Sequence, residues 1–208
     1  MSFDLTPFLD ELTKIFISID EEYKNAQELY DNFSCEGCED NCCTTVFNHY
    51  TLIEDFIVSE GLGLLEPEQL EEAIKRAYAY CAEMSKNRGN IESLKIMCPL
   101  NFEGKCGIYE NRPLICRIHG LPAKLNSPVK GAQSWQGCDR FQKMHPEIPE
   151  KVVRPLRLKE VVIDRTKYYT QVASLEGHLR KLFSYTQKHK KTIAEMVVDF
   201  AKGDDKNL

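Results

Sequence analysis

Four cysteines lie within nine residues near the start of the chain, and this crowding constrains the fold more than any other feature. The segment from Cys35 to Cys43 reads Cys-Glu-Gly-Cys-Glu-Asp-Asn-Cys-Cys, and four more cysteines follow near turn-forming residues. A soft metal ion or an iron-sulfur cluster needs several thiolates that converge from short, sharply turned segments. The sequence therefore predicts a metal site whose candidate ligands are Cys35, Cys38, Cys42, Cys43, Cys98, Cys106, Cys116 and Cys138.

Length and composition predict one domain that spans residues 1–208, with residues 35–140 as its metal-binding region. A chain of 208 residues with 42% hydrophobic residues can bury one substantial core. The net charge of -5 gives no basic footprint for nucleic acid. Neither an export signal nor an apolar run of about 18 residues is visible, so we expect no membrane contact.

The same features predict a cytoplasmic protein, and this changes how its cysteines are interpreted. The cytosol keeps thiols reduced, which favours metal binding over a disulfide framework. Nine cysteines are also an odd number. Cys81 is the one that stands apart, because it lies in a helical pattern where a free cysteine acts as a small buried hydrophobe.

Apolar periodicity predicts a mainly α-helical domain with an irregular cysteine-rich segment. Thr6 is expected to cap a helix whose first residue is Pro7. Thr192 and Glu195, three residues later, match a capping box at the start of the last helix. Gly61 is expected to end a helix. Prolines and glycines predict irregular structure from residue 95 to 150. The expected helices cover residues 6–33, 51–60, 67–86, 155–177 and 192–202.

The cysteine spacings are informative to different degrees. Cys35 and Cys38 are separated by two residues, as in zinc knuckles and ferredoxins. Cys42 and Cys43 are adjacent, and neighbouring side chains normally diverge. Either one of them binds metal while the other packs, or two centres are present. Cys98 precedes a proline, as the closing ligand of many bacterial ferredoxins does.

Together these motifs resemble the bacterial and archaeal cysteine-cluster family of zinc- or iron-chelating proteins. The resemblance spans residues 35–140 and implies metal chelation by the cysteines. Flagellin lysine N-methylases are similar in their cysteine motifs, and that likeness implies an iron-sulfur cluster and S-adenosylmethionine. The motifs are Cys35 to Cys43, then Cys98-Pro99-Leu100, Cys106-Gly107-Ile108-Tyr109-Glu110-Asn111-Arg112-Pro113 and Cys116-Arg117.

The number and identity of the metals stay open from the sequence. Four thiolates can form a closed structural zinc site or hold a [4Fe-4S] cluster, so eight could hold two zinc ions or one cluster and one zinc. The family resemblance favours the cluster.

Five further residues near the cysteines have alternative interpretations. His119 could replace a thiolate ligand. Arg112 and Arg117 could offset the negative charge of thiolates, or Arg117 could form an ordinary surface salt bridge. Tyr109 and Trp135 are interpreted as packing for metal-bound loops rather than as stacking platforms.

Two hypotheses of function follow. In the first, the protein is a metal-binding protein whose cluster or zinc has a structural or redox role. In the second, it is a small methylase-like enzyme that binds S-adenosylmethionine beside the cluster. The sequence specifies no substrate, protein partner or oligomeric state, and no Ser-His-Asp order or phosphate-binding loop is found.

Overall fold

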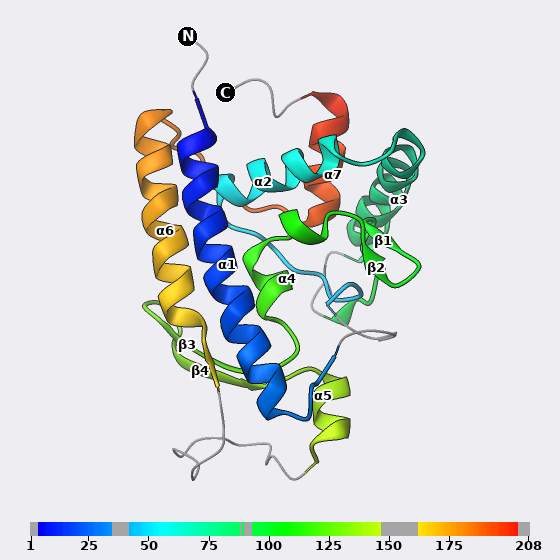
Figure 1. The fold of residues 1–208 in the computed structure, drawn as a ribbon. Helices are drawn as coiled ribbons and strands as arrows, with labels where there is room; N and C mark the ends of the chain where they lie inside the picture. Colours follow the sequence, from blue (N-terminus) through cyan, green and yellow to red (C-terminus); the bar gives the residue numbers. More distant parts are fainter. Residues whose placement is uncertain (1–3, 35–41, 88, 90–92, 147–161, 204–208) are drawn as a thin grey trace.

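The computed structural model describes residues 4–34, 42–87, 89, 93–146 and 162–203, and these form a mainly helical fold (Figure 1). Two small sheets accompany the helices. Within the described residues the helices are α1 Thr6–Leu29, α2 Leu52–Gly63, α3 Pro67–Lys86, α4 Leu114–Ile118, α5 Asp139–Met144, α6 Arg165–Leu182 and α7 Ile193–Lys202, with a 3-10 turn η2 at Tyr109–Asn111.

The apolar side chains form two clusters on either side of the cysteine segments. The first cluster joins α1, the start of α2, α4, α5 and α6, and the second joins the end of α2, α3 and α7. In Figure 1, α1 and α6 run side by side, while α3 and α7 lie at the opposite side with α4 in between. Segments between the two clusters are therefore held from both sides.

Both sheets are short, and both lie next to cysteine segments. β1 (Asn101–Phe102) and β2 (Lys105–Cys106) form an antiparallel hairpin. β3 (Pro122–Ser127) pairs antiparallel with β4 (Gly131–Gln136) and parallel with β5 (Ile163–Asp164). No helix in the described part of the chain is long and apolar enough to cross a membrane.

Two of the expected helices are confirmed closely. α3 has the predicted bounds. α7 begins after the predicted capping box, in which the Thr192 hydroxyl accepts from the Glu195 N–H and the Glu195 carboxylate accepts from the Thr192 N–H. Gly203 ends α7 in the left-handed conformation at φ 73°.

The bounds of the first two helices were predicted less well. α1 ends at Leu29 rather than residue 33, because Asp31 and Asn32 adopt left-handed φ values of 52° and 57°. Thr6 lies inside α1 and does not cap it, since its backbone N–H bonds to Asp4 instead. α2 continues past Gly61, so the prediction that this glycine ends the helix was wrong.

Two other expectations also need correction. The stretch from residue 95 to 150 is not uniformly irregular, because it contains the β3–β4 hairpin with six residues in each strand. The last predicted helix before α7 begins later than expected, at Arg165, and continues through Gly177 to Leu182. A strand, β5, precedes it, and residues 155–161 lie outside the described part.

Candidate metal centre

The two cysteine motifs are joined by main-chain hydrogen bonds between segments some fifty residues apart. The Cys98 N–H donates to the Cys43 carbonyl at 2.6 Å, and the Ile96 N–H donates to the Thr44 carbonyl at 3.0 Å. Thr45 forms an antiparallel bridge with Lys95. This pairing sets Cys43 beside Cys98.

A tight hairpin then returns the chain towards Cys98. Asn101 pairs with Cys106 across β1 and β2, and the Gly107 N–H donates to the Leu100 carbonyl at 2.8 Å. Glu103 and Gly104 form the turn with φ values of 53° and 83°. Because the hairpin is so short, Cys106 lies close to Cys98.

The last segment is α4, which carries Cys116 and is anchored by both neighbouring long helices. The buried Glu54 carboxylate of α2 accepts a hydrogen bond from the Leu114 N–H at 2.9 Å, at the start of α4. Just after α4, the Tyr23 hydroxyl of α1 donates to the His119 carbonyl at 2.8 Å. Cys116 is thereby fixed between the two clusters.

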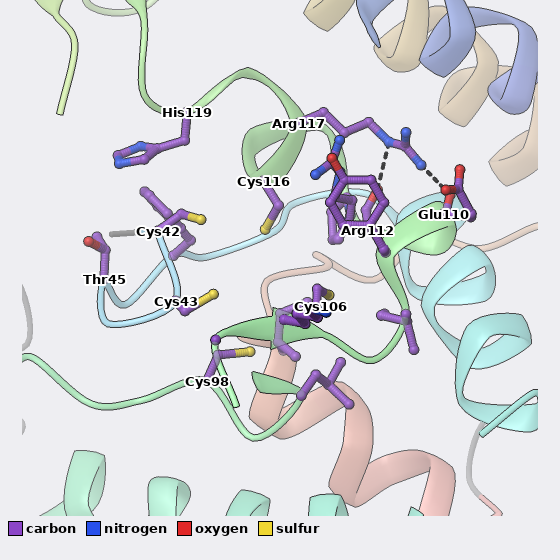
Figure 2. Close-up of a pocket in the computed structure, with 18 of the residues that line it drawn as sticks. Cys42, Cys43, Thr45, Cys98, Cys106, Glu110, Arg112, Cys116, Arg117 and His119 are labelled. Atoms are coloured by element: carbon purple, nitrogen blue, oxygen red, sulfur yellow. Dashed lines mark hydrogen bonds between the residues drawn. The ribbon is translucent and has the colours of Figure 1, made fainter. Parts of the chain in front are cut away.

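These segments enclose a cavity of about 1010 Å³ that five of the predicted cysteines line. Figure 2 shows the sulfur atoms of Cys43, Cys98 and Cys116 directed into a shared space, with Cys106 across from them and Cys42 beside Cys43. Electrostatic interactions connect four of these thiols to one another. We name this set the thiol quartet: Cys43, Cys98, Cys106 and Cys116.

Cys43 differs from the other members of the quartet in its ionisation. The Cys42 thiol donates a hydrogen bond to Cys43 and lowers the Cys43 pKa to about 6 against the opposing effect of burial. Asn101 adds a second hydrogen bond. The Cys43 sulfur is therefore the quartet member most readily available as a thiolate near neutral pH.

Burial raises the pKa of the other three thiols. For Cys98 and Cys106, backbone N–H groups of Leu100 and Ile108 donate to the sulfur and partly oppose this effect. Burial raises the Cys116 pKa well above its ordinary value, and the proximity of the other quartet thiols adds to this rise. A cation that displaces the thiol protons would remove this penalty, because metal-bound cysteine is a thiolate.

Two arginines lie beside the quartet and share one carboxylate of α1. Arg117 is 4% exposed and its Nη1 lies 2.5 Å from Asp20 Oδ2, while Arg112 Nη2 lies 3.4 Å from Asp20 Oδ1. Arg117 also donates to the carbonyls of Arg112 and Glu110. The surface interpretation of Arg117 is thus wrong. Burial raises the Cys106 pKa, and both guanidinium charges partly oppose this rise.

The other three residues singled out in the sequence have mixed surroundings. His119 lines the cavity near Cys42 (Figure 2), and burial lowers its pKa to about 4, so its ring is neutral. Tyr109 also lines the cavity, is 54% exposed and packs under the Arg112 guanidinium at 3.7 Å. Trp135 lies away from the cavity lining, beneath Arg165 at 4.6 Å.

The three other predicted ligands are Cys35, Cys38 and Cys138. Cys138 is buried in the first hydrophobic cluster at the start of α5. Cys35 and Cys38 lie outside the described residues, so their role stays a prediction. Cys81, expected to be a packing residue, contacts the second cluster. None of the seven described cysteines forms a disulfide with another.

Sequence reasoning missed two residues of the cavity wall. Asp20 carries the carboxylate that holds both arginines, and Tyr80 lies on α3 near Cys98. Both occupy ordinary positions in long amphipathic helices, and their spacing carries no motif. Only the folded arrangement brings them to the cysteines.

The cysteine motifs that form this site are similar to those of a known protein family. Residues 34–133 match the family described as CxxCxxCC, putative zinc- or iron-chelating domain. The match covers 100 of the 208 residues, and over this part the chain is similar to that family. All four quartet cysteines fall within the match, whereas Cys138 lies beyond it. Comparison with curated proteins and with solved structures gave no match.

Within the described residues, no group of three or more His, Cys, Asp or Glu side chains is already arranged to hold a metal ion. The donor chemistry nevertheless fits such a group: the quartet offers four sulfurs, two of which receive backbone N–H bonds, next to two arginines. The family match supports chelation of zinc or iron by this part of the chain.

Proposed function

We propose that the thiol quartet holds one four-thiolate metal centre, and that the protein works as a metal-binding protein with a structural or redox role. The observation that carries the proposal is the meeting of four partly buried, mutually interacting thiols from three separate segments in one cavity. Four is the ligand number of both closed zinc sites and cubane clusters.

The surroundings of the quartet suit a negatively charged centre. Four thiolates around a divalent ion carry a net charge of about -2, and a buried charge of this size needs partners. Arg112 and Arg117 supply two positive charges, of which Asp20 offsets one. The backbone N–H groups of Leu100 and Ile108 donate to two of the sulfurs.

Of the two candidate groups, we favour a [4Fe-4S] cluster. A single zinc ion is held at about 2.3 Å from each sulfur, whereas the quartet lines a cavity of about 1010 Å³. A cluster is larger than a single ion, and the cavity has room for it. When bound, a cluster supplies one-electron chemistry and zinc supplies a rigid cross-link.

The test is anaerobic purification, followed by an absorption spectrum and by analysis of iron, zinc and acid-labile sulfide. A brown protein with iron and sulfide in near-equal amounts supports the cluster. A colourless protein with stoichiometric zinc contradicts the cluster but keeps the four-thiolate centre. If neither metal is retained and neither binds on reconstitution, the proposal fails.

A second candidate function is favoured by the size of the cavity, which exceeds what four ligands and one metal centre fill. The cavity extends from the quartet to α1, where Tyr23 and Lys24 form its wall, and its volume is typical of small-molecule sites. A methylase-like enzyme that binds S-adenosylmethionine there is the alternative. Calorimetry of the metal-loaded protein with S-adenosylmethionine tests it, and absence of binding heat and of a shift in Tm rejects it.

The cell compartment and the other predicted ligands belong to the proposal too. Seven described cysteines without a disulfide among them suit a reducing compartment, so we propose that the protein is cytoplasmic. Cys35, Cys38, Cys42 and Cys138 remain candidate ligands of a second metal. Metal analysis of the quadruple variant with serine at all four quartet positions would detect such a site as residual bound metal.

A further inference from the structure

Arg117 of α4 is a buried cation, and α1 provides two of the groups that surround it. Arg117 is 4% exposed, its Nη1 lies 2.5 Å from Asp20 Oδ2, and its guanidinium carbon lies 4.2 Å from the centre of the Phe16 ring. Phe16 and Asp20 are four residues apart on α1 and therefore share one face of the helix. A buried charge without a partner strongly destabilises a fold, so the docking of α1 and the burial of Arg117 depend on each other.

The same guanidinium braces the chain between two members of the quartet. Its Nε donates to the Arg112 carbonyl at 2.9 Å, and its Nη2 donates to the Glu110 carbonyl (Figure 2). Both carbonyls lie in the segment that links Cys106 to Cys116, and Arg117 directly follows Cys116. The position of this guanidinium is therefore coupled to the relative positions of two proposed ligands.

We propose that Asp20 is a positioning residue for the metal centre, because it holds the Arg117 guanidinium where this group fixes Cys106 relative to Cys116. The inference rests on the proposed four-thiolate centre. Asp20 lies outside the matched residues 34–133, so the family match assigns it no role. Metal binding and the docking of α1 should then stabilise each other, since both need the same arrangement of Arg117.

The charge of Asp20 and its positioning role have opposite effects on metal binding. Four thiolates around a divalent ion are negatively charged, so a nearby carboxylate repels the centre, and its removal should by charge alone strengthen metal binding. Loss of the brace should weaken metal binding, because groups that orient metal ligands typically contribute about 10–100-fold to the affinity. The sign of the change in Asp20→Asn therefore separates the two effects.

The experiment compares Asp20→Asn with Glu21→Gln, a matched control that removes the same charge from an exposed position of α1. Each protein is stripped of metal, reconstituted with cobalt(II), and titrated with a chelator. We expect Asp20→Asn to bind cobalt about tenfold more weakly than the wild-type protein and to shift the sulfur-to-cobalt charge-transfer band. Glu21→Gln should match the wild-type protein in both measurements. Unchanged or tighter binding by Asp20→Asn would overturn the inference.

Two further variants test whether the effect passes through Arg117. The Asp20 side chain is 38% exposed, so Asp20→Glu has room to keep the carboxylate near Arg117 and should recover part of the lost affinity. In Arg117→Met the brace is already absent, so the addition of Asp20→Asn should weaken cobalt binding no further. Additive losses in the double variant, or binding by Asp20→Glu as weak as by Asp20→Asn, would contradict the positioning role.

Thermal unfolding separates this role from ordinary stabilisation of the fold. Removal of one partner of a buried ion pair should lower the Tm of metal-free Asp20→Asn. With cobalt bound, the loss of Tm should be larger, because the variant also binds cobalt more weakly. A loss of Tm of the same size in both forms would overturn the inference, because it would show a purely structural ion pair.

Failure of the inference can be distinguished from failure of the proposed function. If the wild-type protein binds cobalt with four-thiolate absorption but Asp20→Asn equals Glu21→Gln, the inference alone is rejected. If the wild-type protein and Cys106→Ser bind cobalt equally, the proposed centre itself is wrong.

Discussion

Cys42 and Cys43 are neighbours in sequence, but their thiols have different surroundings. Cys43 interacts with the other three quartet thiols, whereas Cys42 donates its hydrogen bond to Cys43 and faces His119 (Figure 2). This difference indicates which of the two adjacent cysteines binds the metal, which the sequence leaves open. Cys43 is the proposed ligand, and Cys42 is its hydrogen-bond donor.

We therefore expect Cys43→Ser to lose most of the bound metal, because three thiolates no longer close the centre. Cys42→Ser should keep near-stoichiometric metal, since a serine hydroxyl can still donate to the Cys43 sulfur. Metal analysis of the purified variants measures this, with Cys81→Ser as the control that keeps full metal content. Equal metal loss in Cys42→Ser and Cys43→Ser would contradict the assignment.

The sequence motifs predict the cysteines of the site better than they predict its other residues. A metal needs sulfur ligands at short spacings, and such spacings are visible in a sequence as local patterns. Asp20 and Tyr80 reach the cavity only through the packing of α1 and α3, and a single residue on a helix face gives no signal of its partner. Cys138 was predicted as a ligand but is buried in the first hydrophobic cluster, because a cysteine near a glycine fits equally well in a hydrophobic core.

At the scale of elements, Gly61 is the clearest case in which packing, rather than local preference, sets the residue type. A Cβ atom at this position of α2 would lie 2.7 Å from Asn111 Cβ and 2.9 Å from Ile108 Cβ. The absence of a side chain lets α2 approach η2, the turn between Cys106 and Arg112. The sequence predicts a helix end there because glycine is also typical of helix ends.

We predict that Gly61→Ala lowers the free energy of unfolding by about 1–3 kcal/mol, because the backbones of α2 and η2 must separate. Gly177→Ala is the matched control, since a Cβ atom at that position of α6 meets nothing within 4 Å. It should raise stability by about 0.5–1 kcal/mol, the usual gain of alanine over glycine in a helix. Urea denaturation of both variants measures the difference, and destabilisation by Gly177→Ala as large as by Gly61→Ala would refute the packing argument.

The helices α3 and α7 could be predicted because their signals are local, namely apolar periodicity and the Thr192–Glu195 capping box. The β3–β4 hairpin could not, because Pro122 and Pro128 indicate irregular structure and the strands expose many of their residues. Its pairing is stabilised by β5, which follows far along the chain. Such non-local partners leave no pattern within the strand itself.

For the whole molecule, buried histidines predict sensitivity to acid. Burial and the nearby Lys191 lower the pKa of His189 to about 4, with Arg180 and His49 acting in the same direction and Glu176 opposing them. Its Nε2 lies 3.5 Å from Asp55 Oδ2. Between the ordinary histidine pKa of about 6.5 and this value, the unfolded chain binds more protons than the folded one. Stability is therefore lost as the pH falls from about 6.5 to about 4.

The test is the free energy of unfolding of the metal-free protein at pH 7.5 and pH 4.5. We expect His189→Gln to reduce the loss between these values by about 1–3 kcal/mol, because the titrating group is gone. His178→Gln replaces an exposed histidine of α6 and should leave the loss unchanged. If the free energy of unfolding falls equally between pH 7.5 and pH 4.5 in His189→Gln and His178→Gln, His189 does not cause the loss of stability in acid.

Removal of the metal should affect the whole molecule, because the cavity lies between the two hydrophobic clusters and takes walls from α1, α3, α4 and α7. A ligand present at about 100 times its Kd stabilises a fold by about 2.7 kcal/mol, which corresponds to a rise in Tm of roughly 5–10 °C for a chain of this size. Calorimetry before and after chelation measures the shift. An unchanged Tm would mean that the metal is not coupled to the fold.

The pairing of Cys43 with Cys98 also has a consequence for how the protein is made. One quartet ligand leaves the ribosome well before the other three, and at about 5–20 residues per second Cys116 follows Cys43 by several seconds. Cys43 is then exposed without its partners, and before Asn101 is made and the site has folded, the hydrogen bonds that lower its pKa are not complete. During this interval the nascent chain can be oxidised or can bind the wrong ion, so correct metal loading depends on a reducing environment that lasts until translation has passed α4.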